Sequence, residues 1–208
     1  MLSSDDPTVP REGDDALVAA LMEVERFVSR LGWGSPARLF ALVRTRDLLA
    51  AEPSLEGQLA VGNPDSLSSI EQEGFHPGDD LEAALAAIAW PPGVDGAAIA
   101  VERVMLPADL DAAIPSDPEE AARFVASHPR RQDLRIVAGA LRDGSHHGLA
   151  RVLDHPDDLV GAVDLVPALE AALAHTLVDG PTPTDHTDPT GTSPADLGDH
   201  HSTHQENP

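Results

Sequence analysis

"DLRIVAGALRDGSHHGLARVLD", residues 133–154, holds the pattern that decides the fold. An apolar run at 133–142 is followed by the polar, glycine-containing segment 143–147 and by a second strand-like run at 148–154. Two such runs joined by a short turn predict a β-hairpin. Along the first run one set of alternating side chains is Leu134, Ile136, Ala138 and Ala140, and the other is Arg135, Val137, Gly139 and Leu141. Because both sets are mainly apolar, the pattern predicts a sheet covered on both faces.

The rest of the chain predicts helices and two further strands. The predicted helices cover 14–31, two short turns within 45–59, 80–90, 117–127 and 165–178, and the further strands cover 37–43 and 96–106. Asp79 and Asp117 are the predicted caps of the helices that follow them. Residues 62–78 carry turn residues and little periodicity, so they predict an irregular connection.

This order of elements favours an α+β fold. Helices and strands follow one another as α-β-α-α-β-α-β-β-α, neither strictly alternating nor separated into blocks, which predicts a small, mainly antiparallel sheet of about four strands covered by helices. We expect a single domain at 14–180. Residues 1–13 and 181–208 are polar and rich in proline and acidic residues, so we expect them to be disordered.

Composition excludes several classes of function. The formal charge is −23, from 36 acidic and 13 basic residues, and such a surface repels nucleic acids and anionic membranes. The chain has no Cys, Lys or Tyr, which removes thiolate, Schiff-base and phenolic chemistry. It also has no apolar segment of the length of a signal peptide or a membrane span, so we expect a cytoplasmic protein. No motif indicates a cofactor, and we expect none.

The candidate ligand-binding residues lie in two turns and at one strand end. The turn "HPRRQD" offers His128, Arg130 and Arg131, and arginine suits carboxylate and phosphate groups, which would make an anion site. Arg44 follows the first strand, and Trp33 lies in "GWGSP". The alternatives that involve no ligand are a solvated turn at 128–133 and a structural role for Trp33, which would cover the core.

No residue is predicted to be catalytic. The turn "RDGSHHG" contains Ser, His and Asp side chains, but catalytic groups usually converge from separate segments, so a plain hairpin is favoured over a metal or proton-transfer site. In the C-terminal segment His200 and His204 are spaced i and i+4 and are weak metal-ligand candidates, with a purely solubilising segment as the alternative.

Three segments carry a family resemblance. They are "EVERFVSRLGWGSPARLFALVRTRDLLAAEPSL" at 23–55, "AIAWPPGVDGAAIAVERVMLP" at 87–107 and "HPRRQDLRIVAGALRDG" at 128–144. Together they resemble a family of actinobacterial conserved hypothetical proteins over roughly 15–178. The resemblance implies a cytoplasmic single-domain protein and supplies no catalytic residues. The order of elements is also similar to small secretion-chaperone-like domains, which dimerise and bind partner chains, although residues 45–90 here insert helices in place of a middle strand.

These observations favour a non-catalytic adaptor or chaperone-like module. We expect it to bind a protein or peptide through an exposed sheet edge or a helix groove, and a homodimer is possible. One alternative is a hydrolase that uses His and carboxylates or a metal, with a pocket that places His76, His128, His146 or His155 beside an acidic residue. The other is a sensor that binds a small anion through Arg44, Arg130 or Arg131.

Overall fold

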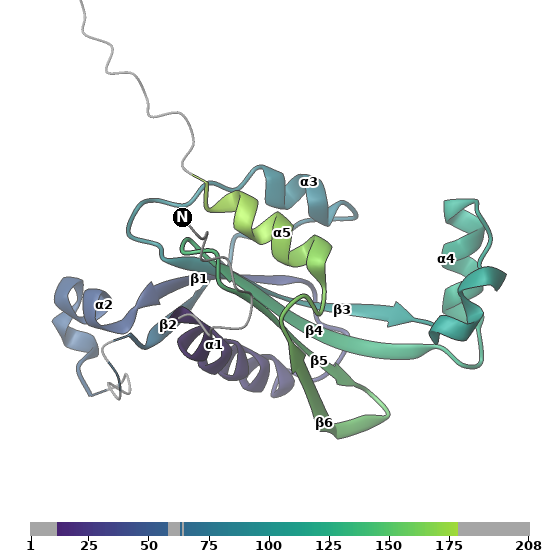
Figure 1. The fold of residues 1–208 in the computed structure, drawn as a ribbon, viewed down its shortest axis with the longest axis horizontal. Coiled ribbons are helices and arrows are strands. Elements are labelled where there is room, and N and C mark those ends of the chain that lie inside the picture. The colour runs from purple at the N-terminus through teal and green to yellow at the C-terminus, as the bar shows by residue number, and fades with distance from the viewer. Residues whose placement is uncertain (1–11, 58–62, 64, 179–208) are drawn as a thin grey trace, which may run out of the picture.

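A six-stranded antiparallel sheet with helices on both faces forms the body of the protein (Figure 1). The structure is a computed structural model, and it describes residues 12–57, 63 and 65–178. The strands are β1 (Arg38–Arg44), β2 (Leu67–Glu71), β3 (Gly96–Met105), β4 (Gln132–Leu141), β5 (His146–Val152) and β6 (His155–Ala162), in the spatial order β2-β1-β3-β4-β5-β6. The α-helices are α1 (Glu12–Ser29), α2 (Thr45–Ala51), α3 (Leu81–Ala86), α4 (Pro118–Ser127) and α5 (Pro167–Thr176).

Two apolar layers hold the sheet between the helices. On one face α1 buries Leu17, Leu21, Val24 and Val28 against the sheet, as its three- and four-residue spacing predicts. On the other face α5 and α3 bury Leu173, Leu177 and Leu85. The alternation along β4 is confirmed, because Val137 and Leu141 lie in the α1 layer whereas Ile136, Ala138 and Ala140 lie in the α5 layer.

The outer halves of β3 and β4 extend beyond this body and carry α4 at their end (Figure 1). The two strands pair along their whole length, from Gly96 opposite Leu141 to Met105 opposite Gln132. Asp117 caps α4 by accepting a hydrogen bond from the Glu120 N–H at 3.0 Å, as predicted. None of the α4 residues is buried. We call residues 102–135, which comprise this extension and α4, the arm.

The α+β class and the antiparallel sheet are confirmed, but the predicted number of about four strands is wrong. The structure has six, because β2 lies within 62–78, which predicted an irregular connection, and β6 follows the hairpin at 155–162. Both are edge strands with little apolar alternation, and β6 also contains Pro156, a residue that argues against a strand in a sequence. The observed order is therefore α-β-α-β-α-β-α-β-β-β-α.

Several boundaries also differ from the predictions. The N-cap of α3 is Asp80, which accepts from the Ala83 N–H at 2.8 Å, so the prediction of Asp79 was wrong. The same helix ends at Ala86 instead of residue 90. Helix α1 begins at Glu12, two residues before the expected domain start. The predicted disorder of residues 1–11 and 181–208 falls outside the described residues. In the part of the chain that the structure describes, the helices are too short or too polar to cross a membrane.

Candidate functional site

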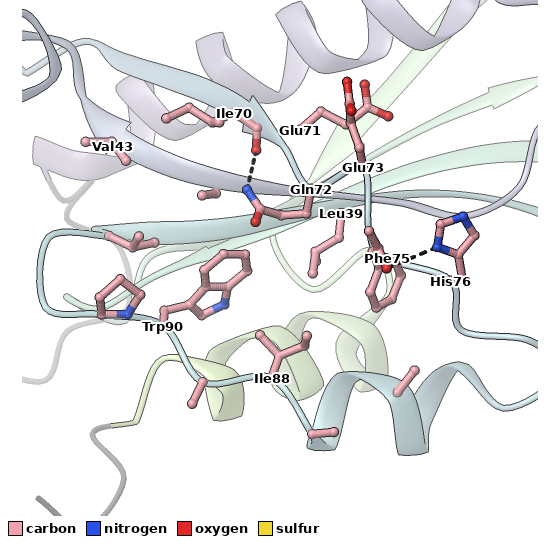
Figure 2. A pocket seen from close by; sticks show the side chains of 17 residues that line it. Leu39, Val43, Ile70, Glu71, Gln72, Glu73, Phe75, His76, Ile88 and Trp90 are labelled. Carbon is pink, nitrogen blue, oxygen red and sulfur yellow. Dashed lines mark hydrogen bonds between the residues drawn. The ribbon is translucent and has the colours of Figure 1, made fainter. Parts of the chain in front are cut away.

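A wide groove of ≈ 970 Å³ lies between the sheet and the segment that contains α3 (Figure 2). Leu39 and Val43 of β1 and Ile70 of β2 form its floor. Phe75 and Trp90, which come from the connections before and after α3, line the opposite side. The groove is therefore lined mainly by apolar side chains, on the same face of the sheet that α5 covers further along.

The α3 side of the groove is held in place by polar contacts to the body. The indole N–H of Trp90 donates to Thr176 Oγ1 of α5 at 2.9 Å. The Arg142 guanidinium donates to the carbonyl oxygens of Trp90 at 3.1 Å and Val94 at 2.8 Å, and also to that of Leu177. Because α3 has only six residues, these contacts, more than the helix itself, position the α3 side of the groove.

Residues 71–76 form the other rim of the groove, and backbone hydrogen bonds to β1 and within the segment hold them in place. The Gln72 N–H donates to Leu39 O at 2.8 Å and continues the β1–β2 pairing. The Phe75 N–H donates to Gln72 O at 2.9 Å in a tight turn. His76 lies just beyond, with Nδ1 3.0 Å from Gly74 O (Figure 2). This turn brings an aromatic ring to the apolar floor and leaves polar side chains at the mouth.

The mouth of the groove at its β2 rim carries two carboxylates, those of Glu71 and Glu73, which point to the other side of the sheet from Trp90 and Ile88 (Figure 2). Glu71 forms an ion pair with Arg38, whereas Glu73 has no hydrogen bond or ion pair with any residue that the structure describes. No arginine is among the side chains that line the groove. A smaller adjoining hollow of ≈ 310 Å³ shares Glu71, Glu73 and His76 and adds Arg38. The net field at the mouth therefore favours a cationic ligand over an anionic one.

The free edge of the sheet runs beside the groove. The N–H of Gln72 faces β1, and backbone groups alternate along a strand, so those of Leu67, Ser69 and Glu71 point away from β1. No described residue pairs with that edge. The opposite edge, β6, carries Pro156 and two aspartates, features that oppose strand addition, whereas the interior of β2 carries none of them.

Trp33 and Arg131 line one small hollow of ≈ 330 Å³ at the base of the arm. The Arg135 guanidinium lies over the Trp33 ring, 4.3 Å from its centroid. Arg131 donates to Ala126 O at 2.7 Å and lies 3.6 Å from an Asp133 carboxylate oxygen. Both candidates are therefore engaged with side chains or carbonyls of the same chain.

The remaining candidates are not brought together. Arg130 forms a two-point ion pair with Asp109, at 2.8 and 2.9 Å, and His128 Nδ1 accepts from the Arg130 N–H within the turn. Arg44 pairs with Asp65 and with Asp95 beside the start of β3, while Asp109 lies beyond the end of that strand. The candidate arginines of the described chain therefore form no joint anion site. His200 and His204 lie outside the described residues.

The groove residues were missed by the sequence interpretation. Ile70 and Phe75 lie in the region that predicted an irregular connection, and Trp90 was expected inside a helix. The available signal was the set of apolar side chains at Leu67, Ile70 and Phe75 in an otherwise polar stretch.

The groove carries few side chains that can act in acid–base or nucleophilic chemistry. Among the described residues no serine or threonine hydroxyl lines it, and its titratable side chains are Glu71, Glu73 and His76. The hydrolase alternative expected one of four histidines beside an acidic residue. His146 lies 3.0 Å from Asp164 outside the groove, and His76 shares the groove with two carboxylates. However, no hydrogen bond or ion pair joins His76 to either carboxylate among the described residues. A base oriented by a carboxylate is therefore not formed here.

Comparison with known proteins gives one match. A family model described as PPA1309-like protein matches residues 17–178. Neither a curated protein nor a solved structure matches the chain.

Proposed function

We propose that this chain, which belongs to the PPA1309-like protein family, is a non-catalytic module that binds a peptide segment of a partner protein. The family name states no activity, so the proposal rests on the groove. The segment is extended, with apolar side chains alternating with basic ones. It adds as a strand to β2 and places its apolar side chains in the groove. The observation that carries this proposal is the outward edge of β2, with which no described residue pairs, directly beside an apolar groove whose β2 rim carries two carboxylates.

Strand addition accounts for the affinity of such a complex. Leu67, Ser69 and Glu71 each offer one N–H and one C=O to an added strand. A strand added to β2 lies about 4.8 Å away, and every second side chain of it falls on the groove side, next to Ile70. Burial of one large apolar side chain contributes about 1.5–3 kcal/mol, against the cost of ordering the peptide. We expect a dissociation constant on the order of micromolar.

Charge complementarity accounts for the preference for basic residues. The chain carries a formal charge of −23, and the carboxylates of Glu71 and Glu73 lie at the β2 rim of the groove mouth, on the other side of the sheet from Trp90 (Figure 2), where every second side chain of an added strand would also lie; Arg38 pairs with Glu71 there. A basic peptide is attracted to this mouth and an acidic one is repelled, so binding weakens as salt is added.

The test uses a fluorescent octapeptide that alternates arginine with valine, and a copy that alternates glutamate with valine. Fluorescence anisotropy with the full chain measures both dissociation constants. We expect binding of the basic peptide alone. Ile70→Asp places a charge on the groove floor, and Ser69→Pro removes an outward N–H at an edge position that tolerates proline. Each should weaken binding about tenfold or more.

The matched control is Val160→Asp on the other edge strand. Val160 is 56% exposed and Ile70 is 39% exposed, so both substitutions add a carboxylate to a partly exposed edge position. Val160→Asp should leave peptide binding unchanged. Equal binding of the acidic peptide, or binding that survives both β2 substitutions, contradicts the proposal. If sedimentation shows a dimer that Ile70→Asp converts to monomer, and no peptide binds, a second copy of the chain fills the edge and the proposal is wrong.

A further inference from the structure

Three side chains from separate segments converge beside the turn between β4 and β5. His146 opens β5, Asp164 lies in the connection from β6 to α5, and Glu170 lies in α5. His146 Nε2 is 3.0 Å from Asp164 Oδ1 and 3.9 Å from Glu170 Oε2. One nitrogen and two carboxylate oxygens from the three residues all lie within 4.8 Å of one another. The groove described above is lined by none of these residues.

The surroundings of His146 and Glu170 orient both side chains toward this point. His146 Nδ1 lies 3.1 Å from Gly144 O, an acceptor, so Nδ1 carries a proton and Nε2 faces the carboxylates. Glu170 is only 2% exposed, and its oxygens accept from the N–H groups of Asp164 and Val166 at 3.2 Å each. Metal-binding histidines in proteins usually donate their other ring N–H to an acceptor such as a backbone carbonyl, and metal-binding carboxylates are usually held by hydrogen bonds of their own.

The electrostatics of the cluster favour a cation. Two carboxylates and a neutral imidazole carry a charge of −2, which matches a divalent ion. No arginine has an ion pair with either carboxylate among the described residues.

We propose that His146, Asp164 and Glu170 bind a divalent transition-metal ion of the Zn²⁺ type. In tetrahedral coordination with Zn–N and Zn–O bonds of about 2.1 Å, two ligand atoms lie about 3.4 Å apart, so the contacts of 3.0 and 3.9 Å need shifts of only about half an ångström to share one ion. Asp164 is exposed and can rotate to complete the set. With three protein ligands the ion keeps at least one position for water or another ligand.

The test is a Zn²⁺ titration by calorimetry at neutral pH. The full chain is used with the histidines of its C-terminal segment, His186, His200, His201 and His204, replaced by alanine, so that their binding does not mask the site. We expect one Zn²⁺ ion per chain and a rise in Tm when Zn²⁺ is added. His146→Ala and Asp164→Asn should each weaken binding about tenfold or more and abolish the rise in Tm.

Two variants keep this test decisive. Asp164 has a φ of 57°, in the left-handed region that asparagine also adopts, so Asp164→Asn removes the ligand charge without straining the backbone. His155→Ala removes an exposed histidine at the far end of the same β5–β6 hairpin and should leave Zn²⁺ binding unchanged. No Zn²⁺ binding, or binding that is the same in His146→Ala, Asp164→Asn and the parent, overturns the proposal.

Discussion

Arg135 shows how one buried charge organises the α1 side of the sheet. Its guanidinium is almost fully buried and donates to Ser29 Oγ at 3.0 Å, to Glu102 Oε1 at 3.1 Å and to the carbonyl of Gly32. The alternation along the strand puts Arg135 on the same face as Val137, which is buried there. Sequence could therefore place the side chain on this face. It could not supply the partners, because they come from a helix end, a turn and another strand.

Replacement of Arg135 by alanine should lower the free energy of unfolding by about 3 kcal/mol, because it leaves Glu102 and the Gly32 carbonyl without their donor and opens a cavity. Urea denaturation followed by circular dichroism measures the change. Arg123→Ala is the matched control, since Arg123 is 75% exposed and its ion pair with Glu119 is 4.0 Å long. Equal stability of Arg135→Ala and the parent would show that the buried network contributes nothing.

At the scale of elements, the sequence predicts the helices and strands whose hydrophobic residues are regularly spaced and misses those without such spacing. Helix α1 and strands β1, β3, β4 and β5 bury a continuous apolar face, so hydrophobic spacing predicts them. The edge strands β2 and β6 bury little, and their pairing depends on neighbours distant in the sequence. The groove was missed for the same reason, because one of its sides is β2 and another is a connection without regular structure.

The contact between α1 and the sheet predicts the effect of one glycine. A Cβ atom on Gly139 of β4 would lie 2.7 Å from Leu21 Cδ2 and 3.1 Å from Leu17 Cδ1, both on α1. Gly139→Ala should therefore lower the free energy of unfolding by about 1–3 kcal/mol. Gly74→Ala is the control, because a Cβ there meets nothing within 4 Å. Thermal unfolding compares the two, and a Tm for Gly139→Ala at or above that of Gly74→Ala would contradict this close packing.

The stabilisation that the Glu25–Arg151 ion pair between α1 and β5 contributes should depend on pH. Glu25 of α1 accepts from Arg151 at 2.6 and 3.0 Å and from Ser29 Oγ at 2.6 Å. Burial raises the pKa of Glu25, but the bonds from Arg151 and Ser29 outweigh it and hold the pKa below its ordinary value of 4.5. A depressed pKa in the folded state stabilises the protein above that value, and the stabilisation is lost as pH falls through the folded-state pKa.

Urea denaturation of the parent and of Glu25→Gln at several pH values tests this link. The parent should be the more stable near neutral pH, and the difference should shrink as pH falls below about 4.5. Arg151→Met leaves Glu25 buried without its partner, so this variant should have a lower free energy of unfolding than the parent near neutral pH. That difference should shrink over the same pH range. A pH-independent difference for Glu25→Gln would mean that the ion pair does not stabilise the fold.

At the scale of the whole molecule, the proposed sites lie apart and use different parts of one scaffold. The groove lies over β2 and β1 and the proposed metal site lies at β5, with β3 and β4 between them. The sheet between them is covered on both faces by the apolar layers of α1 and α5. We therefore expect loss of one site to leave the other intact, and the end of the arm, residues 106–131, lines neither site and should be dispensable for both.

Removal of the arm's end tests this independence. Met105 and Gln132 are directly paired, so an Asn-Gly turn can replace residues 106–131 and close β3 and β4 as a two-residue hairpin. Although the deletion removes the buried Leu106 at the end of β3, none of the residues of α4 is buried, so the shortened chain should still fold. Its free energy of unfolding should stay within about 2 kcal/mol of that of the parent, since the lower entropy cost of a shorter loop offsets the loss of Leu106. Peptide anisotropy and Zn²⁺ calorimetry should match the parent. A shortened chain that is destabilised by more than this, or that binds the basic peptide more weakly, would show that the end of the arm supports the body of the fold.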